Sequence, residues 1–261
     1  MIIPTLPDIP GEHTAIAIIC VGEYNLEALP LALRALAHTG TECPIYVICA
    51  HYERDRIAPK IDERRHRLLA IETPRSNWPQ HQRGLLMAEA SRLAPEHGQI
   101  ICATPRTLFL IDPAILAAEL DMRAEAITDA GQALPLLALP LRDRAATLPT
   151  SVLRLPFIDC LISIRHGFPA DAYGQMLHEI PEKLHKLPML SGICWARLAE
   201  RWGCLDIDPA AWNRPIDQAI GEDTAALHYY SSIDMPVASS VLDAVLVGNY
   251  RRRWHTKGAP A

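Results

Sequence analysis

The chain has 261 residues, 49 % of them hydrophobic and 21 % charged, and its formal net charge is −5. This composition is typical of a folded globular protein and excludes intrinsically disordered, collagen-like and coiled-coil classes. Because there is no excess of positive charge, nucleic acid is not expected as a partner.

Strands and helices alternate along the first hundred residues. Four apolar runs are typical of strands buried on both faces of a parallel sheet, and they cover 15–21, 44–50, 68–72 and 99–103. Helical spacing predicts helices over 26–38, with a stop at Gly40, and over 78–93, with a stop near Pro95. This order predicts right-handed βαβ units, and hence an α/β fold with a mostly parallel central sheet flanked by helices.

The second half of the chain is less regular, because prolines interrupt its apolar stretches. We expect a helix over 114–126, strands or loops over 127–150, a strand over 157–164, helical pieces over 171–186 and 191–202, a short strand over 225–230 and a final helix over 237–254. No repeat or flexible linker marks a boundary. We therefore predict a single domain over 1–261, in which 114–261 elaborates the half formed by 1–113.

Cysteine usage and the ends of the chain bear on its location. No apolar stretch approaches the roughly 20 residues that span a bilayer, and residues 1–8 lack the features of a signal peptide. The seven cysteines form no Cys-x-x-Cys pair, and several lie in strand-like runs. We therefore expect buried, reduced thiols and a cytoplasmic location. The basic stretch 250–257 offers at most a peripheral contact with anionic lipid, the alternative being a solvated end.

Several common catalytic signatures are absent from the sequence. The turn after the first predicted strand, 20–25, is not a Gly-x-Gly-x-x-Gly loop, which argues against a dinucleotide-binding domain. There is no P-loop, no His-Glu-x-x-His and no Gly-x-Ser-x-Gly elbow, and the 11 histidines are not spaced like a zinc site. Asp206-Ile207-Asp208 is a pair of aspartates that chance alone explains, and we expect a solvated turn there.

One stretch resembles the signature of a known family. Residues 100–113 contain a buried strand, a polar break and the run Thr-Leu-Phe-Leu-Ile-Asp-Pro. They resemble the central signature of GT-A-type nucleotide-sugar glycosyltransferases, roughly LDADTLFLRDP, and the chain is similar to the family 8 type. In that family two aspartates of a DxD motif hold Mn²⁺ or Mg²⁺ on the sugar diphosphate. Thr104 and Arg106 take those two positions here, so the DxD motif is degenerate and no metal cofactor is expected.

Other segments follow the family in order over about residues 14–235, which implies a single GT-A-like (Rossmann-like) domain. The resemblance places the nucleotide-sugar donor against Val21, Gly22, Glu23, Tyr24, Arg83, Thr104, Arg106 and His228. Arg83 lies where the family has a helix with a basic residue, and His228 lies in a segment similar to its "IHYxG" element. For Arg106 the alternative is a surface arginine at a strand end, and for His228 it is a structural histidine.

The acceptor side rests on two further segments. Residues 157–164 resemble the family's "FNSGVLLI" strand, which puts Asp159 at the acceptor, and 211–213 resemble its "WN" element, with Trp212 and Asn213. Asp159 is alternatively a buried, hydrogen-bonded carboxylate, and Trp212 a packed aromatic. The partners implied are a nucleotide-sugar donor and a glycan or lipid-linked acceptor.

The resemblance implies a glycosyltransferase that moves a hexose to an acceptor hydroxyl. Asp159 and Arg106 are the catalytic candidates, and Arg106 is expected to replace the metal, because a guanidinium suits a diphosphate. The loss of both DxD carboxylates favours the alternative, a catalytically inactive nucleotide- or partner-binding protein. A third hypothesis is a phosphate-binding α/β protein of unrelated activity.

Overall fold

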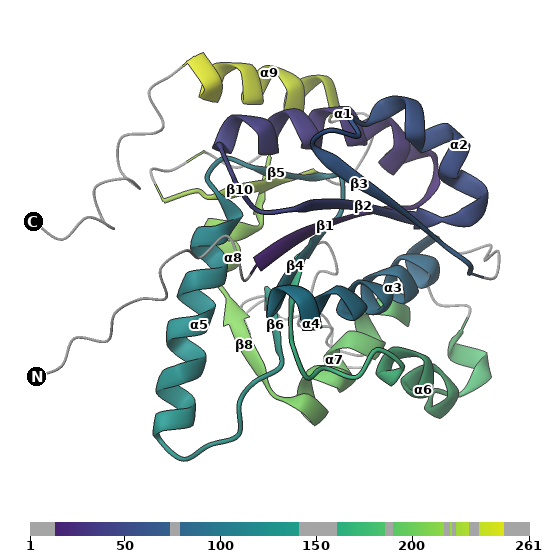
Figure 1. The fold of residues 1–261 in the computed structure, drawn as a ribbon, viewed down its shortest axis with the longest axis vertical. Coiled ribbons are helices and arrows are strands. Elements are labelled where there is room, and N and C mark those ends of the chain that lie inside the picture. Colours follow the sequence, from purple (N-terminus) through teal and green to yellow (C-terminus); the bar gives the residue numbers. More distant parts are fainter. Residues whose placement is uncertain are drawn as a thin grey trace, which may run out of the picture.

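The structure is a computed structural model that describes residues 14–73, 79–140, 161–185, 190–216, 220, 223–229 and 235–247. Its centre is a seven-stranded sheet with the order β3-β2-β1-β4-β7-β6-β8 (Figure 1). The strands are β1 (Thr14–Cys20), β2 (Ile45–Ala50), β3 (His66–Ile71), β4 (Gln99–Ala103), β6 (Leu137–Pro140), β7 (Leu161–Arg165) and β8 (Cys204–Ile207). Strand β7 is antiparallel to both β4 and β6, whereas the other pairs are parallel.

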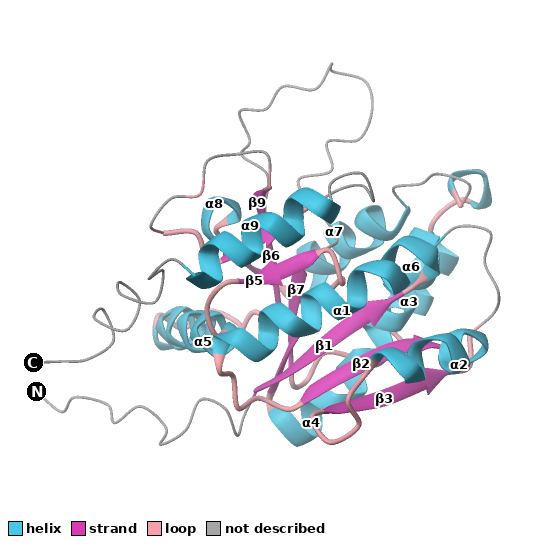
Figure 2. Ribbon diagram, turned by 90° about the horizontal axis from the view of Figure 1, so that it is seen from above, coloured by secondary structure: helices cyan, strands magenta, loops and turns pink. Residues whose placement is uncertain are grey.

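Helices cover both faces of this sheet, as Figures 1 and 2 show. One face carries α1 (Gly22–Thr39), α5 (Pro113–Asp129) and α8 (Pro209–Trp212), and the other carries α3 (Pro79–Ala90), α4 (Ala94–His97), α6 (Ala172–Glu179) and α7 (Leu190–Trp202). Short helical turns join the strands at η1 (His51–Glu53), α2 (Arg54–Ile57), η2 (Ala58–Lys60), η3 (Ser91–Leu93) and η4 (Glu182–Leu184). The predicted α/β class, with a mostly parallel sheet flanked by helices, is confirmed.

Strand β1 shows why the sequence forms this layered core. Side chains alternate between the two faces of a strand. Ala15, Ala17 and Ile19 pack in the core under α3, while Ile16, Ile18 and Cys20 pack in the core under α1. Because both faces are buried, the strand is continuously apolar, as expected in the middle of a parallel sheet.

A second, three-stranded sheet lies beside the first. It has the order β5-β10-β9, formed by β5 (Thr107–Phe109), β10 (Ala226–His228) and β9 (Arg214–Pro215). Strand β10 is antiparallel to β5 and parallel to β9. The pairing returns the chain, more than a hundred residues later, to the segment that directly follows β4.

The first helix begins earlier than the sequence predicted. Residues 20–25 were expected to form a turn before a helix at 26, but α1 starts at Gly22, and Val21 is its extended N-cap. Gly22 has a φ of 76°, a left-handed conformation that glycine adopts without a steric penalty. The helix ends as predicted at Gly40, which has a φ of 72°.

Pro95 does not end the second predicted helix. The chain continues through η3 into α4, and Pro95 lies in the first turn of α4. A proline is tolerated there because its missing N–H has no intrahelical acceptor in a first turn. The helical segment ends instead at Gly98.

The Asp206-Ile207-Asp208 segment is not the solvated turn that we predicted. Asp206 and Ile207 belong to β8, with Asp206 exposed and Ile207 buried. Asp208 is the N-cap of α8, and its carboxylate accepts a hydrogen bond of 2.9 Å from the N–H of Ala210. Of the strand predicted over 157–164, residues 157–160 lie outside the described part of the chain, and 161–164 form part of β7.

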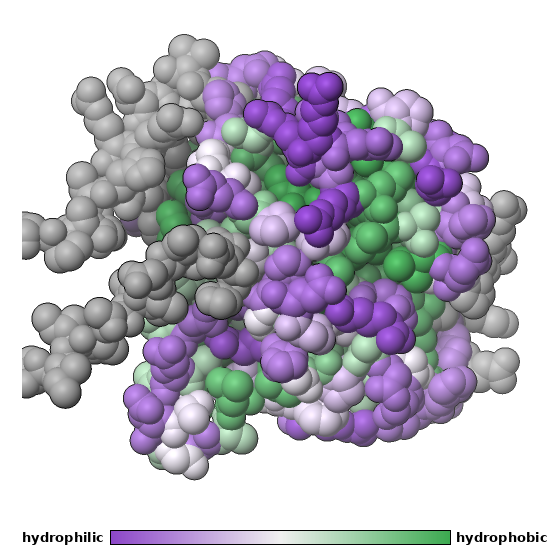
Figure 3. All heavy atoms as spheres, in the orientation of Figure 1, coloured by the Kyte–Doolittle hydropathy of each residue, from purple (hydrophilic) through white to green (hydrophobic). Residues whose placement is uncertain are grey.

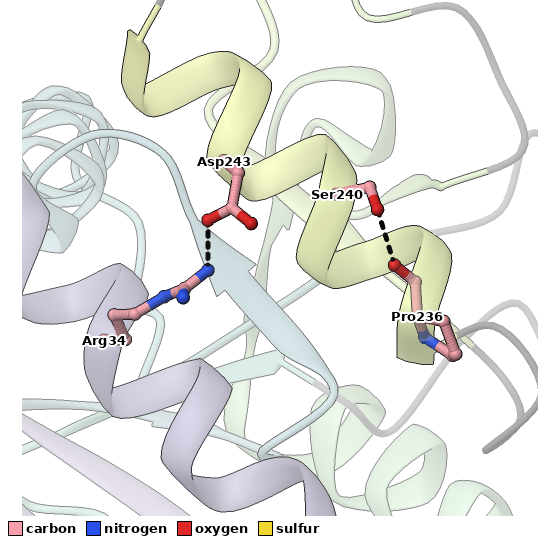
Figure 4. Close-up of polar contacts among 4 residues, drawn as sticks. All are labelled: Arg34, Pro236, Ser240 and Asp243. Atoms are coloured by element: carbon pink, nitrogen blue, oxygen red, sulfur yellow. Dashed lines mark hydrogen bonds and ion pairs between the residues drawn. The ribbon is translucent and has the colours of Figure 1, made fainter.

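The last described helix, α9 (Met235–Val247), packs against α1. Ala28, Ala32 and Ala35 of α1 form a small-residue surface on which Ala238 and Leu242 of α9 are buried. At the edge of this contact, Arg34 and Asp243 form an ion pair of 2.6 Å, and the Ser240 hydroxyl donates to the carbonyl of Pro236 (Figure 4). None of the described helices is long and apolar enough to cross a membrane.

The surface in Figure 3 mixes hydrophilic and hydrophobic areas, and hydrophobic atoms show in the region of the edge strand β3. The last four residues of β3, Leu68 to Ile71, are only partly buried. Strand β3 pairs with β2 alone. Its second edge has no partner strand in the described part of the sheet.

The contact between α3, α6 and α7 gives a stability prediction. A Cβ on Gly84 would overlap the Tyr173 hydroxyl and approach Ser191 Oγ to 2.6 Å. Gly84→Ala is therefore expected to lower the free energy of unfolding by about 1–3 kcal/mol, measured by urea denaturation. Gly174→Ala is the matched control, because a Cβ on this helical glycine meets nothing within 4 Å. It should be neutral or stabilising by up to about 1 kcal/mol. Equal effects of the two substitutions would contradict the close packing of α3.

Candidate functional site

The candidate site lies at the carboxyl ends of β1 and β4, which are neighbours in the sheet. Their register pairs Ile18 with Ala103, so the turns that follow the two strands leave the sheet side by side. Val21 and Gly22 follow β1, and Thr104, Pro105 and Arg106 follow β4. Open α/β sheets bind ligands at this edge, where the chain leaves adjacent strands.

A tight turn holds Arg106 at the end of β4. The N–H of Thr107 donates to the carbonyl of Thr104 at 2.9 Å, so residues 104–107 form a β-turn with Pro105 in its second position. Thr104 is fully buried, and Arg106 is half-buried. Within the described residues, the hydroxyl of Thr104 has no hydrogen-bond partner.

Strand β10 brings His228 to this turn. His228 pairs with Thr107 in the small sheet, and the N–H of Tyr229 donates to the carbonyl of Arg106 at 3.2 Å. His228 is 1 % exposed. The sequence prediction that Arg106 and His228 belong to one site is consistent with this placement, although they are 122 positions apart in the sequence.

Arg83 reaches the same region from the first part of α3. Its side chain is 7 % exposed, which is unusual for an arginine. The guanidinium groups of Arg106 and Arg83 both act electrostatically on His228. Arg83, Arg106 and His228, from three separate segments of the chain, therefore lie close enough to interact electrostatically.

The electrostatics favour an anion and a neutral histidine. Burial, followed by the charges of Arg106 and Arg83, lowers the pKa of His228 to about 3. Burial raises the pKa of the neighbouring Tyr229 to about 12, against the opposing effect of Arg106. At neutral pH the group thus holds two positive guanidinium ions and an uncharged imidazole. Guanidinium groups at a strand end suit the oxygens of a phosphate or diphosphate.

A divalent cation does not fit the described donors at this strand end. Thr104 offers one hydroxyl, and the Arg106 guanidinium would repel a cation at contact distance. Mg²⁺ and Mn²⁺ prefer several oxygen ligands, mainly carboxylates. Across the described part of the chain, no three His, Cys, Asp or Glu side chains come together in a way that could hold a metal.

Sequence reasoning missed Glu53, which lies in η1 directly after β2. Its Oε1 accepts a hydrogen bond of 2.8 Å from the N–H of Gly22. Burial raises the pKa of Glu53, opposed by this hydrogen bond and by Arg56. No motif marks the residue, because its contact with Gly22 depends on the β1–β2 pairing. The only available signal was its position just after a predicted buried strand.

The other predicted donor-side residues lie in the first turn of α1. Glu23 and Tyr24 are both exposed, Tyr24 to 64 %. The carboxylate of Glu23 accepts a hydrogen bond from Arg56 in α2. These two side chains are therefore open to solvent, unlike the buried Val21 at the same end of β1.

The predicted acceptor side is not assembled by the described residues. Asp159 lies outside them. Trp212 is 1 % exposed and belongs to the core under α1, so it has no face open to a sugar, and the packed-aromatic alternative describes it. Asn213 is also buried, and its N–H donates to the carbonyl of Pro209 at 3.1 Å.

Cysteine chemistry is disfavoured at this edge of the sheet. Six cysteines are free in the described part of the chain. Cys20 and Cys49 lie near the carboxyl ends of β1 and β2. Burial, followed by the charge of Glu53, raises the pKa of both thiols, that of Cys49 to about 12. A thiol with so high a pKa is a poor nucleophile at neutral pH.

Comparison with known proteins supports the fold. No family model matches the chain, and no curated protein matches it. The glycosyltransferase GlyE of Streptococcus pneumoniae TIGR4 is similar in structure, with a TM-score of 0.57 and 12 % identity over 95 % of this chain and 65 % of that chain. An active-site mutant of LgtC gives a TM-score of 0.54 and 11 % identity over 88 % of this chain and 94 % of that chain. The chain thus has the GT-A fold of glycosyltransferases, and it spans about 65 % of the length of GlyE.

The buried neutral His228 predicts a pH dependence of stability. The histidine of the unfolded chain binds a proton below pH 6.5, whereas folded His228 stays neutral down to about pH 3. The protein therefore keeps its full free energy of unfolding above pH 6.5, as far as His228 is concerned. Below pH 6.5 the unfolded chain gains a proton that folded His228 does not bind, so the free energy of unfolding falls until about pH 3. The slope reaches up to about 1.4 kcal/mol per pH unit.

Urea denaturation between pH 7 and 4.5 is the measurement. His228→Gln should show the shallower pH dependence, whatever its absolute stability. His166→Gln, which changes an exposed histidine, is the control and should follow the original protein. Parallel curves for His228→Gln and the original protein would contradict a buried neutral imidazole.

Proposed function

We propose that the chain is a glycosyltransferase that binds a nucleotide-sugar and transfers its hexose to an acceptor hydroxyl without an essential metal. The observation that supports this most directly is the group formed by Arg83, Arg106 and neutral His228 at the carboxyl ends of the sheet. The GT-A fold of the chain supports the same assignment.

The group supplies electrostatic stabilisation in this proposal. When the bond between the sugar and the diphosphate breaks, negative charge accumulates on the leaving diphosphate. Arg106 and Arg83 are positioned before the reaction by the turn at Thr104 and by α3, so they stabilise that charge with little reorganisation. The neutral imidazole of His228 contributes a hydrogen bond to a phosphate oxygen, and its low pKa argues against a role as proton donor.

The nucleoside and the acceptor are assigned to different residues of the chain. Val21, Gly22, Glu23 and Tyr24 lie at the start of α1 and are assigned to the nucleoside. Asp159 is kept as the acceptor-side catalytic candidate, to be tested by substitution. The acceptor is proposed to be a glycan or a lipid-linked acceptor, and the free cysteines of the described residues support a cytoplasmic setting.

The alternative is a catalytically inactive domain that binds a nucleotide or a partner. One specific observation favours it: Thr104 and Arg106 stand where the resembling family has its two aspartates. A thermal-shift panel of nucleoside diphosphates and nucleotide-sugars tests for the donor site, because a ligand raises the melting temperature by linkage. Release of free sugar from a stabilising nucleotide-sugar would support the enzyme. Binding without turnover on any acceptor would favour the inactive alternative.

Arg106→Ala is expected to weaken nucleotide-sugar binding by about 1.5–3 kcal/mol, because a charged hydrogen bond at a half-buried position is lost. Calorimetric titration measures this as a roughly 10- to 150-fold rise in Kd. Arg197→Ala removes the same charge from an exposed position on α7 and is the control. If both variants bind as tightly as the original protein, Arg106 does not hold the diphosphate.

Binding is also expected to be insensitive to chelators. Because Arg106 repels a cation where the family binds one, EDTA and added Mn²⁺ should each change Kd by less than about twofold. Titrations of one nucleotide-sugar with and without EDTA provide the measurement. A collapse of affinity in EDTA would place a metal site elsewhere in the chain and refute a metal-independent mechanism.

A further inference from the structure

The short turn η1 makes hydrogen bonds to two sides of the candidate site. One side is the start of α1, called the nucleoside wall below, and the other is the start of α3 with Arg83, called the phosphate wall. The turn η1 follows β2 directly and supplies two adjacent side chains, Tyr52 and Glu53. Glu53 reaches the turn between β1 and α1, and Tyr52 reaches α3. Neither residue was singled out by the sequence, and neither has a role in the mechanism given above.

Glu53 completes the start of α1. The first N–H groups of a helix lack acceptors within the helix, and the N-cap Val21 has no side-chain oxygen to offer one. Glu53 replaces the missing cap from the neighbouring strand, with Oε1 at 2.8 Å from the N–H of Gly22. Its carboxylate also lies at the positive end of the helix dipole. Glu53 therefore fixes the conformation of a left-handed glycine that begins the nucleoside wall.

Tyr52 fixes the beginning of α3 through Gln82. The Tyr52 hydroxyl donates to Gln82 Oε1 at 2.6 Å, and Gln82 Nε2 donates to Thr73 Oγ1 at 3.0 Å. Gln82 is 2 % exposed, and both ends of its amide are hydrogen-bonded. The side chain is therefore held between Tyr52 and Thr73. Because Arg83 is the next residue in the helix, this hydrogen-bonded chain sets the place from which Arg83 leaves α3.

The geometry points to a positioning role for η1: Glu53 positions the nucleoside wall, and Tyr52 positions Arg83 in the phosphate wall. We call these two side chains and their hydrogen bonds the brace. Both are positioning residues: they affect ligand binding only through the residues that they hold in place. This inference rests on the proposed function for the identity of the ligand, but the two hydrogen-bonded connections exist without it.

Comparison of two probes separates the two arms of the brace. Glu53→Ala removes the cap of α1, so it is expected to raise the Kd for a nucleoside diphosphate about fivefold. The Kd for inorganic pyrophosphate should stay unchanged. Tyr52→Phe should raise both Kd values by a similar factor, because Arg83 serves the phosphates in each. Glu53→Gln keeps an acceptor oxygen and should restore binding. His51→Ala, an exposed change in the same turn, should have no effect.

Hydrogen–deuterium exchange tests the brace without any ligand. Glu53→Ala should speed exchange at the start of α1 and not at the start of α3, and Tyr52→Phe should do the reverse. If the original protein binds no nucleotide, the proposed function fails, while these two local changes still support the brace. Unchanged exchange at both helix starts, or equal losses for both probes in Glu53→Ala, would overturn it.

Discussion

The pairing of β10 with β5 is the constraint on which the site depends. It aligns His228 with Thr107 and places the N–H of Tyr229 on the carbonyl of Arg106. The same pairing brings Leu227 over the alanine surface of α1, where α9 also packs. One short antiparallel ladder therefore holds the turn that carries Arg106, buries the histidine and leads the chain to the helix that covers α1.

Positive charge is concentrated in side chains at this site, and the start of α1 contributes little. A helix start commonly binds phosphate through its N–H groups. Here Glu53 occupies the N–H of Gly22 and adds negative charge beside it. The proposed anion is therefore assigned to Arg83 on α3 and to Arg106 at the end of β4. In the proposed function, this distribution separates the neutral-to-acidic start of α1, assigned to the nucleoside, from the cationic side chains assigned to its phosphates.

The elements of the fold that depend on a local sequence pattern could be predicted from the sequence. Apolar runs and helical spacing located β1, β2 and β4 within one or two residues, because strands buried on both faces have a distinctive composition. The early start of α1 was missed, because it depends on Glu53, 31 residues away. Trp212 was assigned to the acceptor because a motif does not report burial. The prediction that Arg83, Arg106 and His228 belong to one site came from the family resemblance, because no sequence periodicity relates the three residues.

The order of the strands has a consequence for synthesis of the protein. Residues 14–103 contain the four adjacent strands β1 to β4, which pair in parallel and leave the ribosome together. Strand β10, which carries His228 of the candidate site, is translated only after residue 225. A growing chain therefore has most of its sheet long before His228 joins Arg106. Contacts between such distant segments form slowly, so the proposed anion site is complete only when the full chain has folded.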